Sequence, residues 1–219
     1  MLYYSIFNIS DLEPSDIDEI REKIKNHFTD RVNLKSTESL VGKALLCMLV
    51  KRNFGLKNFT VDCLENGKPY IVNSDIRFNI SHSDGEVLCV CGDENVGCDI
   101  QRIKPYNEKI AGRFFTAKET ELLEKSVNKA YDFTVLWALK ESALKYSGEG
   151  LSGGLVRYDF SEYYDKKGFC AYGMSFCRAE FSDYIFTICC SDTANPTDAL
   201  KNDKINENKE MKGDFYEHH

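Results

Sequence analysis

The order of the predicted secondary structure constrains this chain of 219 residues more than any other feature. Residues 2–9 have the aromatic and β-branched composition of a strand, and two helical patterns and several short strands follow. The same order, a strand followed by helices and then strands, begins again near residue 95. Because the apolar faces of such elements must be buried against one another, the sequence predicts an α+β protein with two halves.

The predicted boundaries follow from this order. We expect an N-terminal half at residues 1–94, a C-terminal half that carries the candidate metal site at residues 95–190, and a mobile polar tail at residues 191–219. The tail lacks apolar periodicity and is rich in Asn, Lys, Asp and Glu. Within the C-terminal half, residues 156–160 are predicted to form a strand, and residues 169–178 and 181–190 a hairpin.

Charge and composition exclude several classes of protein. A net charge of −7 argues against non-specific binding of nucleic acid, which needs a basic surface. No window reaches the roughly 18 apolar residues of a membrane span. The first residues have no basic segment or cleavage site typical of a secretory signal, and the nine cysteines have no framework spacing. These features predict a cytoplasmic protein with reduced thiols.

Two carboxylates are candidates for chemistry. Asp99 lies in the apolar run Val96–Gln101, where strand alternation places Asp99 and Gln101 on the same face. Glu141 lies in a predicted helix and shares one stripe with Lys145, four residues further on. A carboxylate on a strand and another on a helix can share Mg²⁺ together with phosphate oxygens, and Lys145 could neutralise such a phosphate.

Each of these residues also has an ordinary interpretation. Glu141 and Lys145 could form an exposed i,i+4 ion pair, which stabilises a helix by only about 0.3–0.5 kcal/mol. Asp99 is less easily explained in this way, because burial of an unpaired carboxylate is costly. His82 could be a hydrogen-bonded loop residue or a donor to a phosphate or ribose, and Lys68 an exposed turn lysine or an anion clamp.

The order and spacing of six short motifs are more specific than any single residue. Between residues 67 and 151 the chain contains Gly67-Lys68-Pro69, Phe78-Asn79-Ile80-Ser81-His82-Ser83, Val96-Gly97-Cys98-Asp99-Ile100-Gln101, Arg113-Phe114-Phe115 with Glu119, Trp137-Ala138-Leu139-Lys140-Glu141-Ser142 with Lys145, and Gly148-Glu149-Gly150-Leu151. Together they resemble the 4′-phosphopantetheinyl transferases, in particular the broad-specificity monomeric type that activates surfactin synthetase. The resemblance covers roughly residues 1–190.

The resemblance implies a fold and an activity. Members of this family have two similar α/β halves in one chain, related by a pseudo-twofold axis, with coenzyme A bound in the cleft between them. They transfer the 4′-phosphopantetheine arm of coenzyme A to a serine of an apo acyl- or peptidyl-carrier protein and release adenosine 3′,5′-bisphosphate. The resemblance further implies a monomer that depends on Mg²⁺, with Mn²⁺ as a possible substitute, and no nucleic-acid or membrane partner.

The matching motifs also imply roles for individual residues. Asp99, Gln101 and Glu141 would hold the metal, Glu141 would take the serine proton, and Lys145 would stabilise the leaving phosphate. Other residues would contact the nucleotide end of coenzyme A, namely Lys68, Ser81, His82 and Ser39, with His82 at the 3′-phosphate. Further basic contacts would come from Lys23, Lys25, Arg31 and Lys35, of which Arg31 and Lys35 are our candidates.

One residue departs from the family pattern, and two other functions compete with transfer. Related enzymes often carry Glu where this chain has Gln101, so the site has one negative charge fewer. The amide oxygen of Gln101 or a water could take that place. The alternatives to a transferase are a metal-dependent phosphohydrolase that acts on coenzyme A or a nucleotide, and a non-catalytic module that binds carrier domains.

Overall fold

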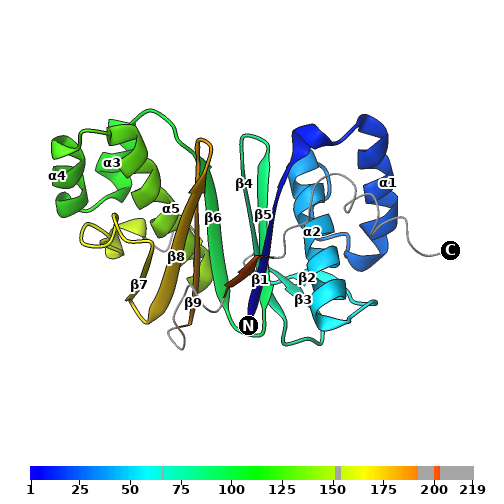
Figure 1. Ribbon diagram of the computed structural model, residues 1–219. Helices are drawn as coiled ribbons and strands as arrows, with labels where there is room; N and C mark the ends of the chain where they lie inside the picture. Colours follow the sequence, from blue (N-terminus) through cyan, green and yellow to red (C-terminus); the bar gives the residue numbers. More distant parts are fainter. Residues whose placement is uncertain (66, 151–153, 192–199, 203–219) are drawn as a thin grey trace. The chain divides into compact units, whose positions relative to one another are not determined.

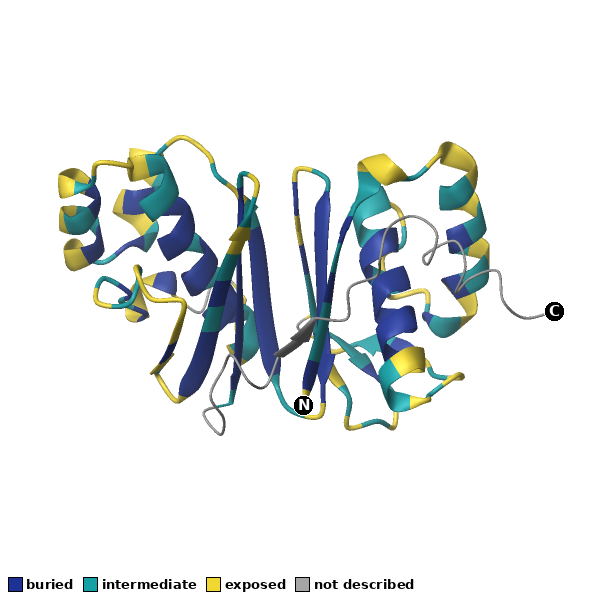
Figure 2. Ribbon diagram, in the orientation of Figure 1, coloured by how far each residue is buried: buried dark blue, intermediate teal, exposed yellow. Residues whose placement is uncertain are grey.

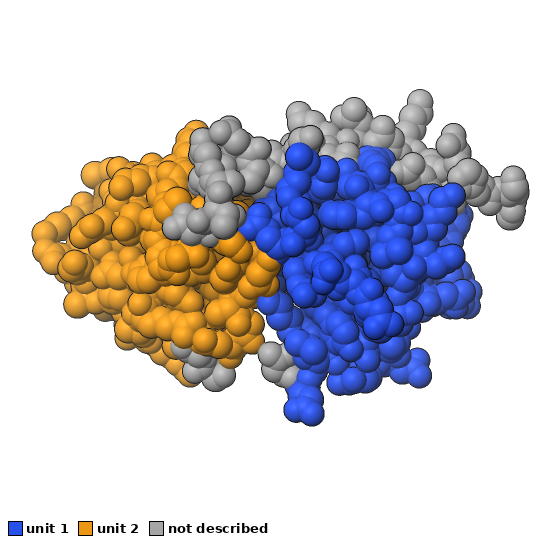
Figure 3. Space-filling view, turned by 90° about the horizontal axis from the view of Figure 1, so that it is seen from below, with its two compact units in different colours: residues 1–94, 200–219 blue, residues 95–199 orange. Residues whose placement is uncertain are grey.

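The structure is a computed structural model that describes residues 1–65, 67–150, 154–191 and 200–202 (Figure 1). Leu151 of the last motif and most of the predicted tail lie outside the described residues. The chain divides into two compact units, with unit 1 comprising residues 1–94 and 200–219 and unit 2 comprising residues 95–199 (Figure 3). The predicted cleft between the two halves stays a prediction.

Unit 1 is built around one long helix. Its elements are β1 (Leu2–Asn8), α1 (Pro14–Ile24), α2 (Thr37–Phe54), β2 (Val61–Cys63), β3 (Pro69–Ile71), β4 (Arg77–Ser83), β5 (Glu86–Gly92) and β10 (Leu200–Asn202), with 3₁₀ turns at Ile9–Asp11 and Lys25–His27. The helix α2 begins where the side chain of Ser36 accepts a hydrogen bond from Ser39 N, and it ends at Gly55, which has a left-handed φ of 66°.

The main sheet of unit 1 has the strand order β10-β1-β5-β4. β1 and β5 are antiparallel, and β5 forms a hairpin with β4. The helix α2 packs on one face of this sheet and α1 packs on α2. The buried side of α2, dark blue in Figure 2, forms the core with Phe7, Phe78 and Val87 from the strands. The short strands β2 and β3 form a separate two-stranded sheet.

Unit 2 repeats this plan with more helices. Its elements are β6 (Val96–Arg102), α3 (Glu108–Phe114), α4 (Ala117–Lys125), α5 (Lys129–Ser147), a 3₁₀ turn at Leu155–Arg157, β7 (Gly168–Ala171), β8 (Met174–Phe181) and β9 (Tyr184–Ser191). A capping box begins α4, because the side chains of Thr116 and Glu119 each accept a hydrogen bond from the backbone N–H of the other residue. Among the described residues, none of the helices is long and apolar enough to cross a membrane.

The two units share a strand topology. In unit 2 the order is β6-β9-β8-β7, so the first strand pairs antiparallel with the last, which forms a hairpin with the strand before it. In unit 1, β1, β5 and β4 are connected in the same way. Each unit therefore places one long helix, α2 or α5, on one face of a sheet of this topology. The predicted α+β class is confirmed.

A glycine allows α5 to lie directly on the strand β6. A Cβ atom at Gly97 would lie 2.1 Å from the carbonyl oxygen of Ser142 and 2.5 Å from the backbone nitrogen of Tyr146. Cys189, which lies opposite Gly97 on β9, also bonds α5 at this level, because its Sγ donates to Ser142 O at 3.2 Å. Strand and helix are thus in backbone contact two residues before Asp99.

The predicted strand at residues 156–160 is wrong. The structure has a 3₁₀ turn at Leu155–Arg157 followed by irregular chain. The reason is that side chains rather than a neighbouring strand satisfy the backbone here: Lys140 Nζ donates to Leu155 O at 3.0 Å, and Phe160 N donates to Glu119 Oε1 at 2.9 Å. The apolar residues of this segment fill the core of unit 2 without forming a ladder.

Two further expectations need correction. Residues 169–178 do not form one strand, because Tyr172 and Gly173 adopt left-handed φ angles of 56° and 70° and turn the chain between β7 and β8. The predicted tail also contains a strand, since β10 pairs in parallel with the start of β1. Its sequence lacks the apolar alternation by which an isolated strand would be predicted. Residues 192–199 and 203–219 of the tail lie outside the described residues.

We predict that Gly97→Ala destabilises the protein, because the added methyl group must push β6 away from α5. Overpacking of this kind costs about 1–3 kcal/mol of unfolding free energy, measurable by urea denaturation. Gly112→Ala is the matched control, because Gly112 lies in α3 and its added methyl group would have no neighbouring atom within 4 Å. That change should stabilise the protein slightly through helix propensity. Equal effects of the two substitutions would contradict the packing argument.

Candidate active site

Asp99 lies in the middle of β6, and its side chain is buried and fully engaged. Only 1% of the residue is exposed. Lys145 Nζ, on α5, contacts Asp99 Oδ1 at 2.6 Å, and Gln101 Nε2 donates to Asp99 Oδ2 at 2.9 Å. The predicted alternation is therefore correct, because Asp99 and Gln101 share the strand face that meets Lys145. The carboxylate is held by a cation and an amide.

Glu141 belongs to the same cluster. Its position on α5 is one turn before Lys145. Burial raises the pKa of Glu141 to about 6, the negative charge of Asp99 contributes to this rise, and Lys145 opposes both effects. The two carboxylates predicted as a pair are thus close enough to repel each other.

Lys145 carries the positive charge of this cluster. Burial acts to lower its pKa, but the neighbouring Asp99, Cys98 and Glu141 outweigh burial, and the net pKa lies above the ordinary value for lysine. Because this pKa is raised, the side chain is protonated. It is 28% exposed, so it can still be reached from solvent. An ordinary surface ion pair between Glu141 and Lys145 does not describe this arrangement, because the lysine bonds a buried aspartate across the helix–strand interface.

The donor set of this cluster suits a hard cation. It offers two carboxylates and one amide, which are the oxygen groups that Mg²⁺ takes together with water and phosphate. Burial is the larger cause of the raised pKa of Glu141 and the charge of Asp99 adds to it, and a bound cation would oppose both effects. Among the described residues, no three His, Cys, Asp or Glu side chains lie close enough together to hold a metal ion. The cluster therefore has the two acids that the sequence predicts and no third.

Beside this cluster, α5 is anchored by a fully buried ion pair that sequence analysis missed. Lys140 Nζ lies 2.7 Å from Glu119 Oε2, and both side chains are 0% exposed. Burial acts to lower the pKa of Lys140, and Glu119 opposes that effect. The lysine also bonds Leu155 O and Tyr158 O, and the glutamate accepts from Thr116 N and Phe160 N.

This pair connects three segments in the core of unit 2. It joins the start of α4, the chain at residues 155–160 and the middle of α5. Because Lys140 directly precedes Glu141, anchoring the lysine in the core limits rotation of α5 about its axis. The orientation of Glu141 toward the Asp99 side therefore depends on the Glu119–Lys140 pair.

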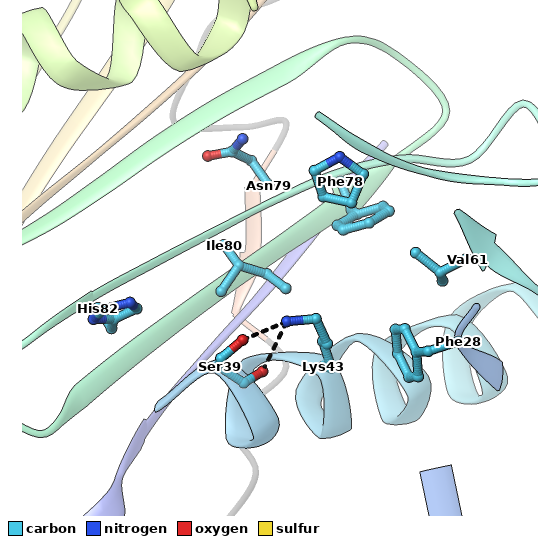
Figure 4. A pocket seen from close by; sticks show the side chains of 9 residues that line it. Phe28, Ser39, Lys43, Val61, Phe78, Asn79, Ile80 and His82 are labelled. Carbon is cyan, nitrogen blue, oxygen red and sulfur yellow. Dashed lines mark hydrogen bonds between the residues drawn. The ribbon is translucent and has the colours of Figure 1, made fainter. Parts of the chain in front are cut away.

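Unit 1 contains a pocket of about 220 Å³ between α2 and β4 (Figure 4). Ser39 and Lys43 from α2 and Asn79 and His82 from β4 provide its polar side chains. Its other lining residues are Phe28, Val61, Pro69, Phe78 and Ile80. Figure 4 shows Lys43 extending from α2 toward β4, with its ammonium bonded to Ser39.

The pocket brings together two of the six residues predicted to contact a nucleotide, Ser39 and His82. Ser81 is 5% exposed, and strand alternation places its side chain on the other face of β4 from His82. Lys68 precedes Pro69 outside the pocket lining, and its carbonyl accepts from Leu64 N. The roles of these residues stay predictions.

The two remaining basic candidates lie in the segment before α2. Arg31 Nη1 bonds Asp62 Oδ2 at 3.4 Å, and the backbone nitrogen of Lys35 bonds Asn33 Oδ1 at 2.9 Å. Neither residue lines the pocket.

Sequence analysis missed Lys43 and the Glu119–Lys140 pair. A signal for Lys43 exists, because it lies one helical turn after Ser39 within the apolar pattern of α2 and therefore shares the face of Ser39. A signal for Lys140 is weaker. The lysine sits among buried residues of α5, but its partner Glu119 is distant in sequence and already has a role as the capping-box residue.

We predict that Glu141→Gln stabilises the metal-free protein at high pH. Because the folded pKa of about 6 exceeds the unfolded value of 4.5, the folded state binds the proton more tightly, and ionisation of Glu141 costs stability. The penalty is absent below pH 4.5 and grows as the pH rises through 6. The variant should gain about 1–2 kcal/mol at pH 8, and little at pH 4.5, in urea unfolding with a chelator present.

The matched control is Glu121→Gln, an exposed glutamate in an i,i+4 pair with Lys125 on α4. Its pKa is lowered by the hydrogen bond and charge of Lys125, so no gain at high pH is expected. A loss of stability of Glu141→Gln at pH 8, or a gain that does not depend on pH, would contradict the repulsion inferred for the cluster.

Comparisons with known proteins agree with the motifs. Residues 95–189 match the family model of the 4′-phosphopantetheinyl transferase superfamily. The 4′-phosphopantetheinyl transferase Sfp of Bacillus subtilis is 35% identical over 139 residues, which cover 61% of each chain. The 4′-phosphopantetheinyl transferase gsp of Aneurinibacillus migulanus is 36% identical over 57% of this chain and 54% of its own length.

A more distant similarity extends over slightly more of the chain. The L-aminoadipate-semialdehyde dehydrogenase-phosphopantetheinyl transferase of Saccharomyces cerevisiae is 32% identical over 65% of this chain and 57% of its own length. The chain thus spans about three fifths of the length of the curated relatives that it matches. The chain is similar to these transferases, and its residues 95–189 match the model of the 4′-phosphopantetheinyl transferase superfamily.

Proposed function

We propose that this chain transfers the 4′-phosphopantetheine arm of coenzyme A to a serine of an apo acyl- or peptidyl-carrier protein and releases adenosine 3′,5′-bisphosphate. The observation that carries the proposal is the cluster of Asp99, Glu141 and Lys145, which lies inside the region that matches the superfamily. Its relatives are named as 4′-phosphopantetheinyl transferases, which supports the same activity here.

The proposed cluster would use a divalent cation. Asp99 and Glu141 would hold Mg²⁺, or Mn²⁺ in its place, and Gln101 is the third proposed ligand through its amide oxygen. When bound, the ion would neutralise charge on the pyrophosphate of coenzyme A. Gln101 already donates its Nε2–H to Asp99, so it also supports the carboxylate in a way that a glutamate could not.

The side chains of the cluster suit the proton and charge movements of the transfer. The serine oxygen would bond to the phosphorus of the pantetheine phosphate as that phosphorus loses its bridging oxygen. Glu141 would accept the serine proton, and its pKa of about 6 suits a base near neutral pH. Lys145, whose pKa is raised, would remain charged and balance the leaving phosphate.

The nucleotide end of coenzyme A would occupy the pocket of unit 1. Ser39 and His82 line this pocket, and its apolar walls suit the adenine ring. Further contacts are proposed for Lys68, Ser81, Arg31 and Lys35. Since one chain supplies all of these groups, we propose that it acts as a monomer. We also propose that it acts in the cytoplasm.

Mass spectrometry of an apo carrier protein tests the proposal. Incubation with the chain, coenzyme A and Mg²⁺ should add about 340 Da, the mass of the arm, to the carrier serine. A panel of fatty-acid, polyketide and peptide carrier domains covers the possible acceptors. Release of products from coenzyme A without any carrier would instead support a phosphohydrolase, and an unmodified panel would support a binding module.

Substitutions in the cluster should reduce transfer without unfolding the protein. Asp99→Ala and Glu141→Gln are each expected to lower turnover by about 10² or more, because each removes charge from the reacting groups. The exposed Glu121→Gln serves as the control and should retain full turnover. Unchanged transfer by Asp99→Ala would overturn the assignment of the metal site.

A further inference from the structure

Two of the six sequence motifs contain residues that the proposed transfer does not use. They are Phe115 and Glu119 in one motif, and Trp137 and Lys140, which precede Glu141 on α5, in the other. In the structure these four residues contact one another. Phe115 stacks on Trp137, with ring centroids 6.4 Å apart. Lys140 Nζ lies 5.5 Å from the centre of the Phe115 ring and 2.7 Å from Glu119 Oε2. The two motifs therefore meet in unit 2.

The polar groups of Glu119 and Lys140 are used within the core. Both side chains are 0% exposed, so neither can touch a substrate. An ammonium has three hydrogens to donate, and Lys140 has an acceptor for each in Glu119 Oε2, Leu155 O and Tyr158 O. Glu119 in turn accepts from Phe160 N and from the first backbone N–H of its own capping box. Any role of this pair in the reaction must act through the elements that it connects.

Stability alone does not account for an ion pair at this depth. Taking two charges out of water is costly, and apolar residues of similar volume often stabilise a core as well or better. An apolar pair, however, can pack at several rotations of a helix, whereas a charged pair bonded to backbone atoms of other segments fits only one. The pair therefore specifies the rotation of α5 about its axis.

The rotation of α5 decides where the reacting side chains point. Successive residues of a helix point about 100° apart, so fixing the direction of Lys140 also fixes that of Glu141. Lys145, one turn beyond Glu141, reaches Asp99 Oδ1 on β6 at 2.6 Å. The helix α5 contacts both α4 and β6 (Figure 1), so the pair acts on the side of α4 and the site lies on the side of β6. A small rotation would move both reacting groups relative to Asp99.

We propose that Glu119 and Lys140 are positioning residues of the transfer reaction, which hold α5 at the rotation where Glu141 and Lys145 face Asp99. The inference rests on the proposed function, and it adds to the site two residues that no reactant touches. It also explains why the two motifs occur together, because each supplies one member of the pair.

A change of one methylene group in the pair tests this role. Glu119→Asp keeps the charge but shortens its reach to Lys140. The fold should persist, because α1 has an aspartate, Asp16, at the same position of its own capping box. A small displacement of a reacting group lowers a rate strongly, so we expect the turnover of carrier modification to fall about tenfold or more. The KM for coenzyme A should change by less than about twofold, because no contact with that substrate is altered.

Leu123→Val is the matched control. It also removes one carbon from a fully buried side chain of α4, one turn after Glu119, and it leaves the pair intact. Urea unfolding at the assay temperature gives the folded fraction of each variant, so that turnover can be expressed per folded molecule. On this scale Leu123→Val should retain the wild-type turnover. A role in stability alone would leave the turnover per folded molecule of Glu119→Asp unchanged as well.

Lengthening the partner should restore the contact. Arginine reaches further than lysine and has five N–H donors, enough for the carboxylate and the two carbonyl oxygens that Lys140 contacts. We expect Lys140→Arg alone to lower turnover, because the pair becomes too long for the site. Glu119→Asp combined with Lys140→Arg should recover most of the wild-type turnover. Losses that add in the double variant would mean that the two residues act independently.

Trp137 reports the rotation of α5 without any turnover. It is the single tryptophan of the chain, and it lies edge-on to the Phe114 ring at 5.7 Å and stacked on the Phe115 ring. Because a rotation of α5 changes these contacts, Glu119→Asp should shift the fluorescence emission of the folded protein. The double variant should return to the wild-type emission, and Leu123→Val should not depart from it.

Several results would overturn the proposal. These are an unchanged turnover of Glu119→Asp per folded molecule, an equal loss for Leu123→Val, additive losses in the double variant, and an unchanged emission of Trp137 in Glu119→Asp. If the wild type modifies a carrier protein, any of these results removes the positioning role alone. If the wild type modifies no carrier protein, the proposed function fails, and the emission of Trp137 still shows whether the pair holds α5.

Discussion

The close contact between β6 and α5 determines the geometry of unit 2. Gly97 has no side chain, so the backbone of α5 at Ser142 lies directly on the strand. Asp99 is two residues along the strand from this point, and Lys145 is three residues along the helix. The short distance between Lys145 Nζ and Asp99 Oδ1 is therefore a consequence of backbone packing. A larger residue at position 97 would separate the two elements that carry the charged groups.

The Glu119–Lys140 pair complements this contact. Gly97 sets the distance between helix and strand, whereas the buried pair limits rotation of the helix about its axis. A buried ion pair is costly unless all its hydrogen-bonding capacity is used. Here the surrounding backbone groups of Thr116, Leu155 and Phe160 supply the remaining partners. The same groups explain why residues 155–160 form no strand, because their backbone atoms are bonded to side chains.

Local signals in the sequence predicted the elements that depend on local physics. Strand alternation placed Asp99 and Gln101 on one face, and the structure has the two side chains in contact. The helix ends also depend on local groups, such as the capping side chains of Ser36 and Thr116 and the left-handed Gly55. Contacts between distant residues were not predictable in this way. The partner of Lys140 lies 21 positions earlier in the chain, and β10 pairs with β1 although the two strands are far apart in the sequence. Only folding makes such residues neighbours.

The two candidate sites have opposite electrostatic imbalances. In unit 2, repulsion from Asp99 adds to burial in raising the pKa of Glu141, so this cluster has an excess of negative charge that a cation would relieve. In unit 1, burial lowers the pKa of Lys43 in the wall of the pocket. Each shift disfavours the charged form in the free protein, and each would be reversed by a ligand of opposite charge.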